Sequence, residues 1–141
     1  MNYDKLKLEN QLCFPLYACS KEIIKKYKPF LDPLDLTYTQ YITLMALWEE
    51  DNVTVKSLGE KLFLDSGTLT PLLKKMESQQ LIIRTRSLND ERNVYIKLTK
   101  KGVELKNKVM AIPDRIGECI SISPEDAIFL HKILHKLLDQ F

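Results

Sequence analysis

Apolar residues recur every three or four positions through most of this chain, which is the spacing of amphipathic helices. The first such stretch covers about residues 10–28. Its apolar face consists of Leu12, Leu16, Cys19 and Ile23. We interpret Cys19 as a core residue on that face. Pro29 and Pro33 predict the end of the helix, because the residue before a proline avoids the helical conformation.

Two helix start signals follow. Thr37 and Gln40 have the spacing of a capping box, in which each side chain bonds the backbone N–H of the other residue. They predict a helix over about 37–50. Thr54 is the predicted N-cap of a short helix that ends near Leu62.

The next helix has a polar face rich in hydroxyl groups. Asp65 or Ser66 is its predicted N-cap. The apolar face consists of Leu69, Leu72, Leu73 and Met76. The opposite face carries Thr68, Thr70, Lys74 and Lys75. Pro71 lies inside this pattern, where it removes a backbone hydrogen bond and is predicted to kink the helix. Such a local departure from helix rules indicates a functional segment.

Two β-prone runs come next, 82–87 and 94–98, and they flank a charged tip at 89–93. This pattern predicts a β-hairpin. Helix, turn, helix and hairpin is the order of a winged helix-turn-helix. The predicted fold is therefore mainly α with a small β-hairpin wing. We expect one domain over 1–141, with its DNA-binding winged helix over about 37–99.

Helix signals resume after the hairpin. Thr99 is the predicted N-cap of a long helix that runs to about Ile112, where Pro113 interrupts it. Ser123 followed by Pro124 is the start signal of the last helix. The apolar residues of that helix are Ile128, Leu130, Ile133, Leu134, Leu137, Leu138 and Phe141.

The two ends of the chain, about 8–30 and 100–141, are more apolar than one short domain core requires. Helices that read DNA grooves usually work in symmetric pairs. We therefore predict that these end helices form a homodimer. The alternative is that they pack only on their own subunit.

Composition limits the class of protein. A chain of 141 residues with 45% hydrophobic and 28% charged residues is typical of one soluble globular domain. No apolar run is long enough to span a bilayer and no signal peptide is recognisable, so we expect a cytoplasmic protein without a membrane partner. The formal net charge of +2 permits nucleic-acid binding without arguing for it, so the placement of the charges decides.

The sequence offers little for metal or enzyme chemistry. Cys13, Cys19 and Cys119 lack metal-ligand spacing. His131 and His135 are four residues apart on the last helix, but no third ligand is evident, so we predict no metal site. The chain has no Ser-His-Asp arrangement, phosphate loop or carboxylate pair. We therefore expect neither an enzyme nor a cofactor.

The helix over 66–76 and the hairpin predict a DNA-binding surface. Hydroxyls and a helix N-terminus suit phosphates and base edges, and lysines suit phosphates. The candidate residues on the helix are Ser66, Thr68, Thr70, Lys74 and Lys75. The candidates on the wing are Arg84, Arg86, Asp90 and Arg92. Arg92 on an exposed hairpin suits a narrow minor groove, and Asp90 can orient its guanidinium. The alternative is an ordinary solvated polar face.

Cys13 is a candidate reactive thiol. It lies third in the first helix if Asn10 is the N-cap, and just outside it if Pro15 is the first helical residue. Either position is near the positive end of the helix dipole, which favours the thiolate form. The alternative is a buried structural cysteine.

Several segments, in order along nearly the whole chain, resemble the MarR family of transcriptional regulators. They resemble specifically its organic-hydroperoxide-sensing repressors. The segments are Asn10 to Phe14, Tyr27-Lys28-Pro29, Leu36 to Tyr41, Leu64 to Lys74 and Asp90-Glu91-Arg92. The most specific are Leu12-Cys13-Phe14 and Asp65-Ser66-Gly67-Thr68-Leu69-Thr70-Pro71.

The resemblance implies a dimeric repressor that binds a pseudo-palindromic double-stranded DNA operator. It implies that an organic hydroperoxide oxidises Cys13 to a sulfenic acid and thereby releases the DNA. It also implies that two tyrosines of the other subunit hold the reduced cysteine; Tyr27 and Tyr38 match them, with Tyr17 a weaker candidate. Cys119 lies before the last helix, near where two-cysteine members carry a resolving thiol. It is either that thiol or a bystander, and in the latter case a low-molecular-weight thiol would take the role.

Helix geometry agrees with a site between subunits. Cys13 and Tyr27 are 14 residues apart, about 21 Å along one helix, so they cannot touch within a subunit. The rival functions are a MarR-type regulator released by a small aromatic ligand, a thiol-dependent peroxidase that uses Cys13, and a winged-helix protein-interaction module. The hydroxyl-rich helix face and the wing arginines argue against the last of these.

Overall fold

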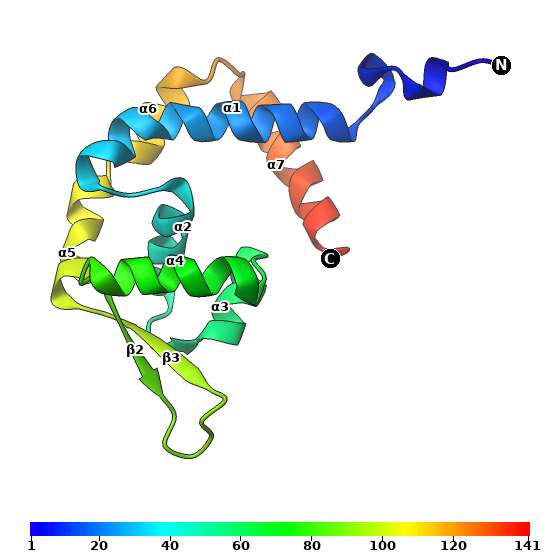
Figure 1. The fold of residues 1–141 in the computed structure, drawn as a ribbon. Coiled ribbons are helices and arrows are strands. Elements are labelled where there is room, and N and C mark those ends of the chain that lie inside the picture. The colour runs from blue at the N-terminus through cyan, green and yellow to red at the C-terminus, as the bar shows by residue number, and fades with distance from the viewer.

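The computed structural model describes all residues, 1–141, and is mainly helical with one small sheet (Figure 1). The helices are α1 (Cys13–Leu31), α2 (Tyr38–Glu49), α3 (Val55–Leu62), α4 (Ser66–Ser78), α5 (Lys100–Val109), α6 (Ile112–Cys119) and α7 (Pro124–Leu138). The strands are β1 (Val53–Thr54), β2 (Ile82–Arg86) and β3 (Val94–Leu98). Short 3-10 helices lie at Asp4–Leu6, Leu8–Asn10 and Asp32–Leu34. The predicted fold class is confirmed.

The wing is an antiparallel hairpin of β2 and β3, in which Ile82 faces Leu98 and Arg86 faces Val94. Its strands are those predicted, within one residue. The sequence analysis missed β1, two residues that pair with the other edge of β3 and give the order β1-β3-β2. A strand this short has no periodicity of its own, so only its pairing with β3 identifies it.

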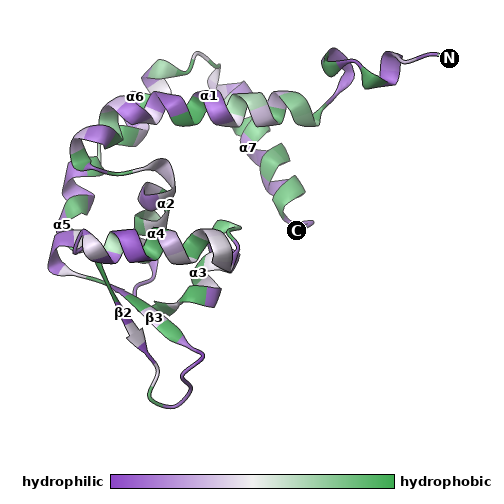
Figure 2. Cartoon of the chain, viewed as in Figure 1, coloured by the Kyte–Doolittle hydropathy of each residue, from purple (hydrophilic) through white to green (hydrophobic).

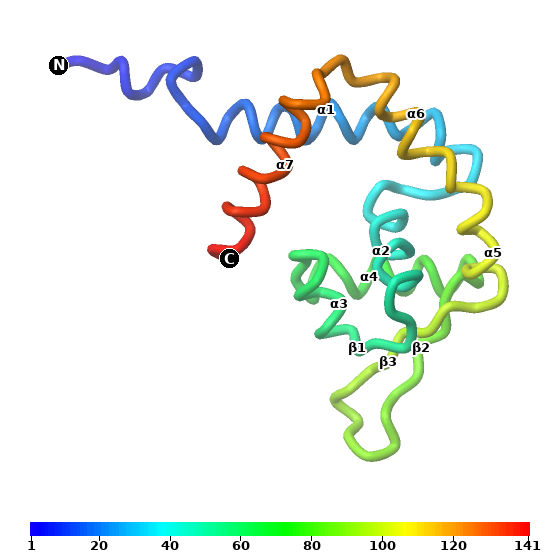
Figure 3. The backbone as a smooth tube through the Cα atoms, turned by 180° about the vertical axis from the view of Figure 1, so that it is seen from behind, coloured from blue at the N-terminus to red at the C-terminus, as the bar shows by residue number.

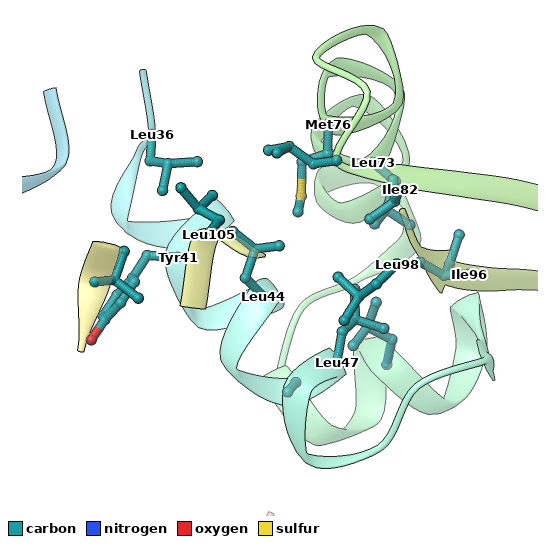
Figure 4. Close-up of a cluster of buried hydrophobic side chains, with 14 of the residues drawn as sticks. Leu36, Tyr41, Leu44, Leu47, Leu73, Met76, Ile82, Ile96, Leu98 and Leu105 are labelled. Carbon is teal, nitrogen blue, oxygen red and sulfur yellow. The ribbon is translucent and has the colours of Figure 1, made fainter. Parts of the chain in front are cut away.

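Most of the hydrophobic core lies inside the winged helix, and the rest joins it to α1, α5 and α6 (Figure 4). Leu44 of α2, Leu73 and Met76 of α4 and Ile96 of β3 have no solvent-exposed surface. The three predicted apolar positions Leu69, Leu73 and Met76 of α4 are all buried, and Leu72 is half-buried. This packing fixes the orientation of α4, and therefore the direction in which its polar face points.

The predicted N-caps are confirmed. Each cap side chain accepts the backbone N–H of the residue three positions on, which supplies one of the donors left unpaired at a helix start. The capping residues are Thr37, Thr54, Asp65, Thr99 and Ser123. Thr37 and Gln40 form the complete capping box. Helix starts are predictable from sequence because these bonds are local.

The limits of α1 differ from the prediction. The helix begins at Cys13, so neither Asn10 nor Pro15 marks its start. It also passes through Pro29 and ends at Leu31, beside Pro33. A proline removes only its own N–H bond, and the backbone N–H of Asp32 still bonds the Lys28 carbonyl across it. The proline step at 33 thus ends the helix, whereas the one at 29 does not.

Two further prolines lie in helices. α4 runs without interruption from Ser66 to Ser78, with Pro71 inside it. α5 ends at Val109, three residues before the predicted end, and Pro113 lies in the first turn of α6. Pro113 starts that helix rather than interrupting one, because a first-turn N–H has no intrahelical partner to lose.

The end helices leave apolar side chains exposed. α1 and α7 extend beyond the winged helix (Figures 1 and 3), and hydrophobic residues, green in Figure 2, recur along both helices. No residue of α7 is buried. On α1 the predicted apolar face is exposed, Cys19 included, so the prediction of Cys19 as a core residue is wrong for the single subunit. None of the helices combines the length and the hydropathy that a membrane span requires.

Candidate nucleic-acid interface and redox site

The N-terminus of α4 is held by Asp65. Its Oδ1 accepts the backbone N–H of Thr68 at 2.8 Å. This bond lowers the pKa of Asp65, so the cap is an anion at neutral pH. Ser66 and Thr68 next to it are exposed, and Thr70 is half-buried. The start of α4 therefore presents hydroxyls and free N–H groups on a fixed turn.

A cleft of about 330 Å³ lies between α3, the exposed side of α4 and the base of the wing. Its lining residues are Thr54, Val55, Lys56, Thr70, Leu73, Lys74, Arg84, Arg86, Arg92, Asn93 and Val94. Five of these carry a positive charge and none carries a carboxylate. A cleft whose charged side chains are all positive favours a polyanion, and a nucleic-acid phosphate backbone is one.

The structure brings five predicted DNA-binding residues to this cleft: Thr70, Lys74, Arg84, Arg86 and Arg92. It adds Lys56 and Asn93, which the sequence analysis missed. Lys56 is an exposed residue in the first turn of α3, and nothing in its neighbours distinguishes it from other surface lysines. Its place beside the wing follows only from the pairing of β1 with β3.

Arg84 differs from the other wing arginines because it contacts α4. The carboxylate of Glu77 on α4 accepts the Arg84 backbone N–H at 3.3 Å and lies 3.7 Å from its Nε. The side chain of Arg84 is about one quarter exposed. These contacts place Arg84 at the joint between the wing and α4, the candidate recognition helix. Arg86 and Arg92 are exposed farther along the hairpin.

Lys75 lies outside the cleft. It lines a separate hollow with Asp32, Asp35, Leu36 and Thr37, which belong to the connection between α1 and α2. Adjacent helical residues point about 100° apart, so Lys74 and Lys75 cannot both face the cleft. The sequence analysis placed both on one polar face.

Cys13 is the first residue of α1 and is exposed. No side chain caps this helix start. The positive end of the dipole is therefore available to the sulfur, as expected. Tyr17 follows one turn later on the same side of the helix, with Lys21 Nζ 5.0 Å from the centre of its ring.

Three tyrosines meet at the far end of α1. The ring centres of Tyr27 and Tyr38 are 4.9 Å apart, and Tyr41 lies 5.8 Å from Tyr27 and 6.3 Å from Tyr38. Burial raises the pKa of Tyr27 and of Tyr38, so both phenols are neutral hydrogen-bond donors at physiological pH. Tyr27 and Tyr38 thus lie together within one subunit, at the end of α1 opposite Cys13.

Tyr41 was missed by the sequence analysis. It follows Tyr38 by one turn of α2, so the spacing i, i+3 could have indicated it. Its side chain is buried at the edge of the core, and its hydroxyl points away from the other labelled side chains (Figure 4). Burial raises its pKa as well.

The remaining candidates lie apart from these residues. Cys119 is the last residue of α6 and is exposed. α6 packs along α1, with the guanidinium of Arg115 5.3 Å from the ring centre of Phe30. On α7 the Nε2 atoms of His131 and His135 are 3.0 Å apart. No group of three or more His, Cys, Asp or Glu side chains is arranged to hold a metal ion.

Helix α3, a turn, helix α4 and a hairpin flanking a cationic cleft together define a winged helix-turn-helix. Comparison with known proteins agrees. Residues 25–109 match the model of the transcriptional regulator SarA/Rot family. The organic hydroperoxide resistance transcriptional regulator of Bacillus subtilis is 54% identical over 137 residues, which cover 97% of this chain and 93% of that protein. The regulator SarZ of Staphylococcus saprophyticus is 46% identical, covering 94% and 91%.

Solved structures give the same family. Reduced AbfR bound to DNA is 32% identical with a TM-score of 0.81, and 99% of this chain and 98% of that chain are covered. AbfR is a protein of Staphylococcus epidermidis. Its disulfide form, which is 34% identical and covers 96% and 95%, has a TM-score of 0.67. The chain belongs to the MarR-type winged-helix transcriptional regulators, in the group of the organic hydroperoxide resistance regulators.

Proposed function

We propose that this protein is a homodimeric repressor that binds DNA in the reduced state and leaves its operator when an organic hydroperoxide oxidises Cys13. The observation that carries the proposal is the separation of Cys13 from the tyrosine cluster. Both belong to α1, yet 14 residues, about 21 Å, lie between Cys13 and Tyr27. A second subunit on the exposed apolar side of α1 brings a cysteine and a tyrosine cluster together.

The DNA half of the proposal rests on the cationic cleft. α4 enters the major groove with the hydroxyls of Ser66 and Thr68 at its leading end, and the wing places Arg92 at the minor groove. The phosphate backbone between the two grooves then passes over the cleft. Lys56 and Lys74 lie on its two sides and neutralise phosphates.

The dimer rests on the apolar surfaces of the end helices. Phe129 of α7 is 65% exposed and Leu12, just before α1, is 74% exposed. Large exposed apolar side chains that recur along two helices indicate an interface. A homodimer also provides two copies of α4, which a pseudo-palindromic operator requires.

The sensing chemistry is a two-electron oxidation of sulfur. The Cys13 thiolate attacks the terminal oxygen of the hydroperoxide, a sulfur–oxygen bond forms and the O–O bond breaks. The leaving alkoxide takes a proton and departs as an alcohol, while Cys13 becomes a sulfenic acid. A thiol then attacks the sulfenic sulfur; a disulfide forms and water leaves. That thiol is a low-molecular-weight thiol of the cytoplasm or Cys119.

The phenols of Tyr27 and Tyr38 give the reduced sulfur its partners. Neutral phenols donate hydrogen bonds to a thiolate. Once an oxygen or a second sulfur is added, the sulfur no longer fits between them. The subunits then shift, and the two copies of α4 lose the spacing of about one helical turn that DNA demands.

The decisive experiment measures binding to the DNA upstream of the protein's own reading frame, by fluorescence anisotropy, with and without cumene hydroperoxide. The wild-type protein has to bind when reduced and to dissociate when oxidised. Cys13→Ser has to bind and to ignore the peroxide, whereas the control Cys19→Ser, altered two turns along the same helix, has to respond. Release of Cys13→Ser by the peroxide contradicts the redox proposal. Release by a small aromatic acid alone supports the ligand-controlled alternative.

A further inference from the structure

Two glutamines from distant parts of the chain connect the tyrosine cluster to the recognition helix. Gln40 lies on α2, two residues after Tyr38, and its side chain is completely buried. Gln79 is the C-cap residue of α4. The amide nitrogen of Gln40 donates to the amide oxygen of Gln79 at 3.0 Å, across 39 residues of sequence.

The capping box fixes the direction of this bond. Gln40 Oε1 accepts the backbone N–H of Thr37 at 3.0 Å, so the amide group can turn only its nitrogen towards Gln79. Gln79 must then present its oxygen to Gln40 and its nitrogen elsewhere. That nitrogen donates to the carbonyl oxygen of Asp35 at 2.8 Å and to its carboxylate at 3.1 Å.

The end of α4 is therefore held from three sides. Gln40 holds it to the start of α2, Asp35 to the connection before α2, and Lys101 of α5 donates to the Gln79 carbonyl at 2.8 Å. Asp35 has a left-handed backbone with φ of 53°, which fixes the course of the connection. Because Gln40 is buried and its donor is used, displacing either end of the Gln40–Gln79 bond leaves a buried amide without a partner.

We propose that the Gln40–Gln79 bond transmits the state of the redox site to the recognition helix. The proposal rests on the function proposed above. Tyr38 is the first residue of α2, and the capping box fastens Gln40 to that same turn. When oxidation displaces Tyr38, the turn moves, Gln40 moves with it, and α4 is pulled at its C-terminal end. Gln40 and Gln79 are positioning residues that touch neither Cys13 nor DNA in this scheme.

The test distinguishes an effect on the oxidation-dependent loss of affinity from an effect on DNA binding itself or on the oxidation rate of Cys13. Gln79→Met keeps the length of the side chain and leaves the capping box intact. It removes the bond to Gln40 of α2 and the two bonds to Asp35 in the connection before α2. Ser78→Ala is the matched control, since the Ser78 hydroxyl bonds only Lys75 of the same helix. For each protein the operator affinity is measured by anisotropy before and after cumene hydroperoxide, and the oxidation rate of Cys13 by trapping the sulfenic acid for mass spectrometry.

Gln79→Met should oxidise at the wild-type rate and bind DNA when reduced. The factor by which oxidation lowers its operator affinity should be at least about fivefold smaller than the factor for the wild type. Ser78→Ala should match the wild type in all three measurements. Equal loss of affinity in Gln79→Met and wild type overturns the proposal while leaving the redox function intact. If the wild type is not released by peroxide, the proposed function itself fails.

A second measurement covers the case in which reduced Gln79→Met is folded but binds DNA too weakly. Hydrogen–deuterium exchange of the wild type, reduced and oxidised, tests the coupling of α2 to α4 without substitutions. Oxidation has to raise exchange at 35–41 and at 76–81 together. A rise at 35–41 with unchanged exchange at 76–81 overturns the proposal.

Discussion

The side chains of Asp90 and Arg92 form a fork at the tip of the wing: Arg92 Nε lies 3.1 Å from Asp90 Oδ1, and Nη2 lies 3.4 Å from Oδ2. The hydrogen bond from Arg92 lowers the pKa of Asp90, so the carboxylate stays charged at physiological pH. The arginine itself is almost fully exposed. Its guanidinium is therefore held in one direction without being covered, as a DNA-contacting arginine requires.

Arg92→Ala should weaken operator binding by on the order of 1–3 kcal/mol, because it removes an oriented cation from the protein surface that contacts DNA. The affinity is measured by anisotropy at several salt concentrations, where the variant should also show a smaller salt dependence. Lys97→Ala is the control, since Lys97 is an exposed residue of β3 outside the cleft. Unchanged affinity of a folded Arg92→Ala dimer would remove Arg92 from the interface.

A mixed dimer should reveal that the redox site is shared between subunits. One subunit carries Cys13→Ser, and the other carries Tyr27→Phe with Tyr38→Phe. If Cys13 pairs with tyrosines of the other subunit, this dimer keeps one complete site. It should then show about half of the Cys13 reactivity with cumene hydroperoxide that the wild-type dimer shows. The reactivity is followed by trapping the sulfenic acid.

The corresponding homodimers serve as controls for the mixed dimer. The Cys13→Ser homodimer lacks the sensing sulfur, and the double phenylalanine homodimer lacks the Tyr27 and Tyr38 phenols that would hold it. A mixed dimer as slow as the phenylalanine homodimer would place the tyrosines in the same subunit as their cysteine, or outside the site.

Cys119→Ser should distinguish the two routes from sulfenic acid to disulfide. We expect release from DNA by cumene hydroperoxide to persist in this variant when a low-molecular-weight thiol is present. The reason is that α6, which Cys119 ends, contacts α1 near Phe30, whereas Cys13 lies at the opposite end of α1. Intact-mass spectrometry should then detect Cys13 joined to the added thiol. If release is lost and the wild type instead contains a Cys13–Cys119 disulfide, the two-cysteine route operates.

Gly102→Ala should destabilise the fold by about 1–3 kcal/mol, because a methyl group there overpacks the contact between α5 and the turn before β2. An added Cβ would clash with the backbone carbonyl oxygen of Leu81, where no side chain can yield. Gly117→Ala is the control: its Cβ would meet nothing within 4 Å, so α6 should tolerate it or gain slightly from better helix propensity. Urea unfolding of both variants checks the difference, and equal midpoints would contradict the packing argument.

Much of the fold could be read from the sequence because it depends on local interactions. The capping residue Thr37 lies three positions from its partner, and Asp90 lies two positions from Arg92. The order of helices and the hairpin followed from such signals and predicted the winged helix. The prolines were harder to interpret. Both Pro29 and Pro113 lack a backbone N–H, but Pro29 lies in the last turn of α1 and Pro113 in the first turn of α6, and the sequence does not say which turn a proline occupies.

The sequence by itself determined which residues are apolar, which cap helices and which carry charge at the wing. The tertiary structure alone decided that Lys56 joins the wing arginines, that Tyr41 joins Tyr27 and Tyr38, and that Gln40 meets Gln79. These contacts join residues far apart in the chain, and no local pattern encodes them. The apolar face with Cys19 shows the same limit. Periodicity predicts that this face packs against apolar groups, but only the tertiary structure shows whether those groups belong to the chain's own core or to another surface.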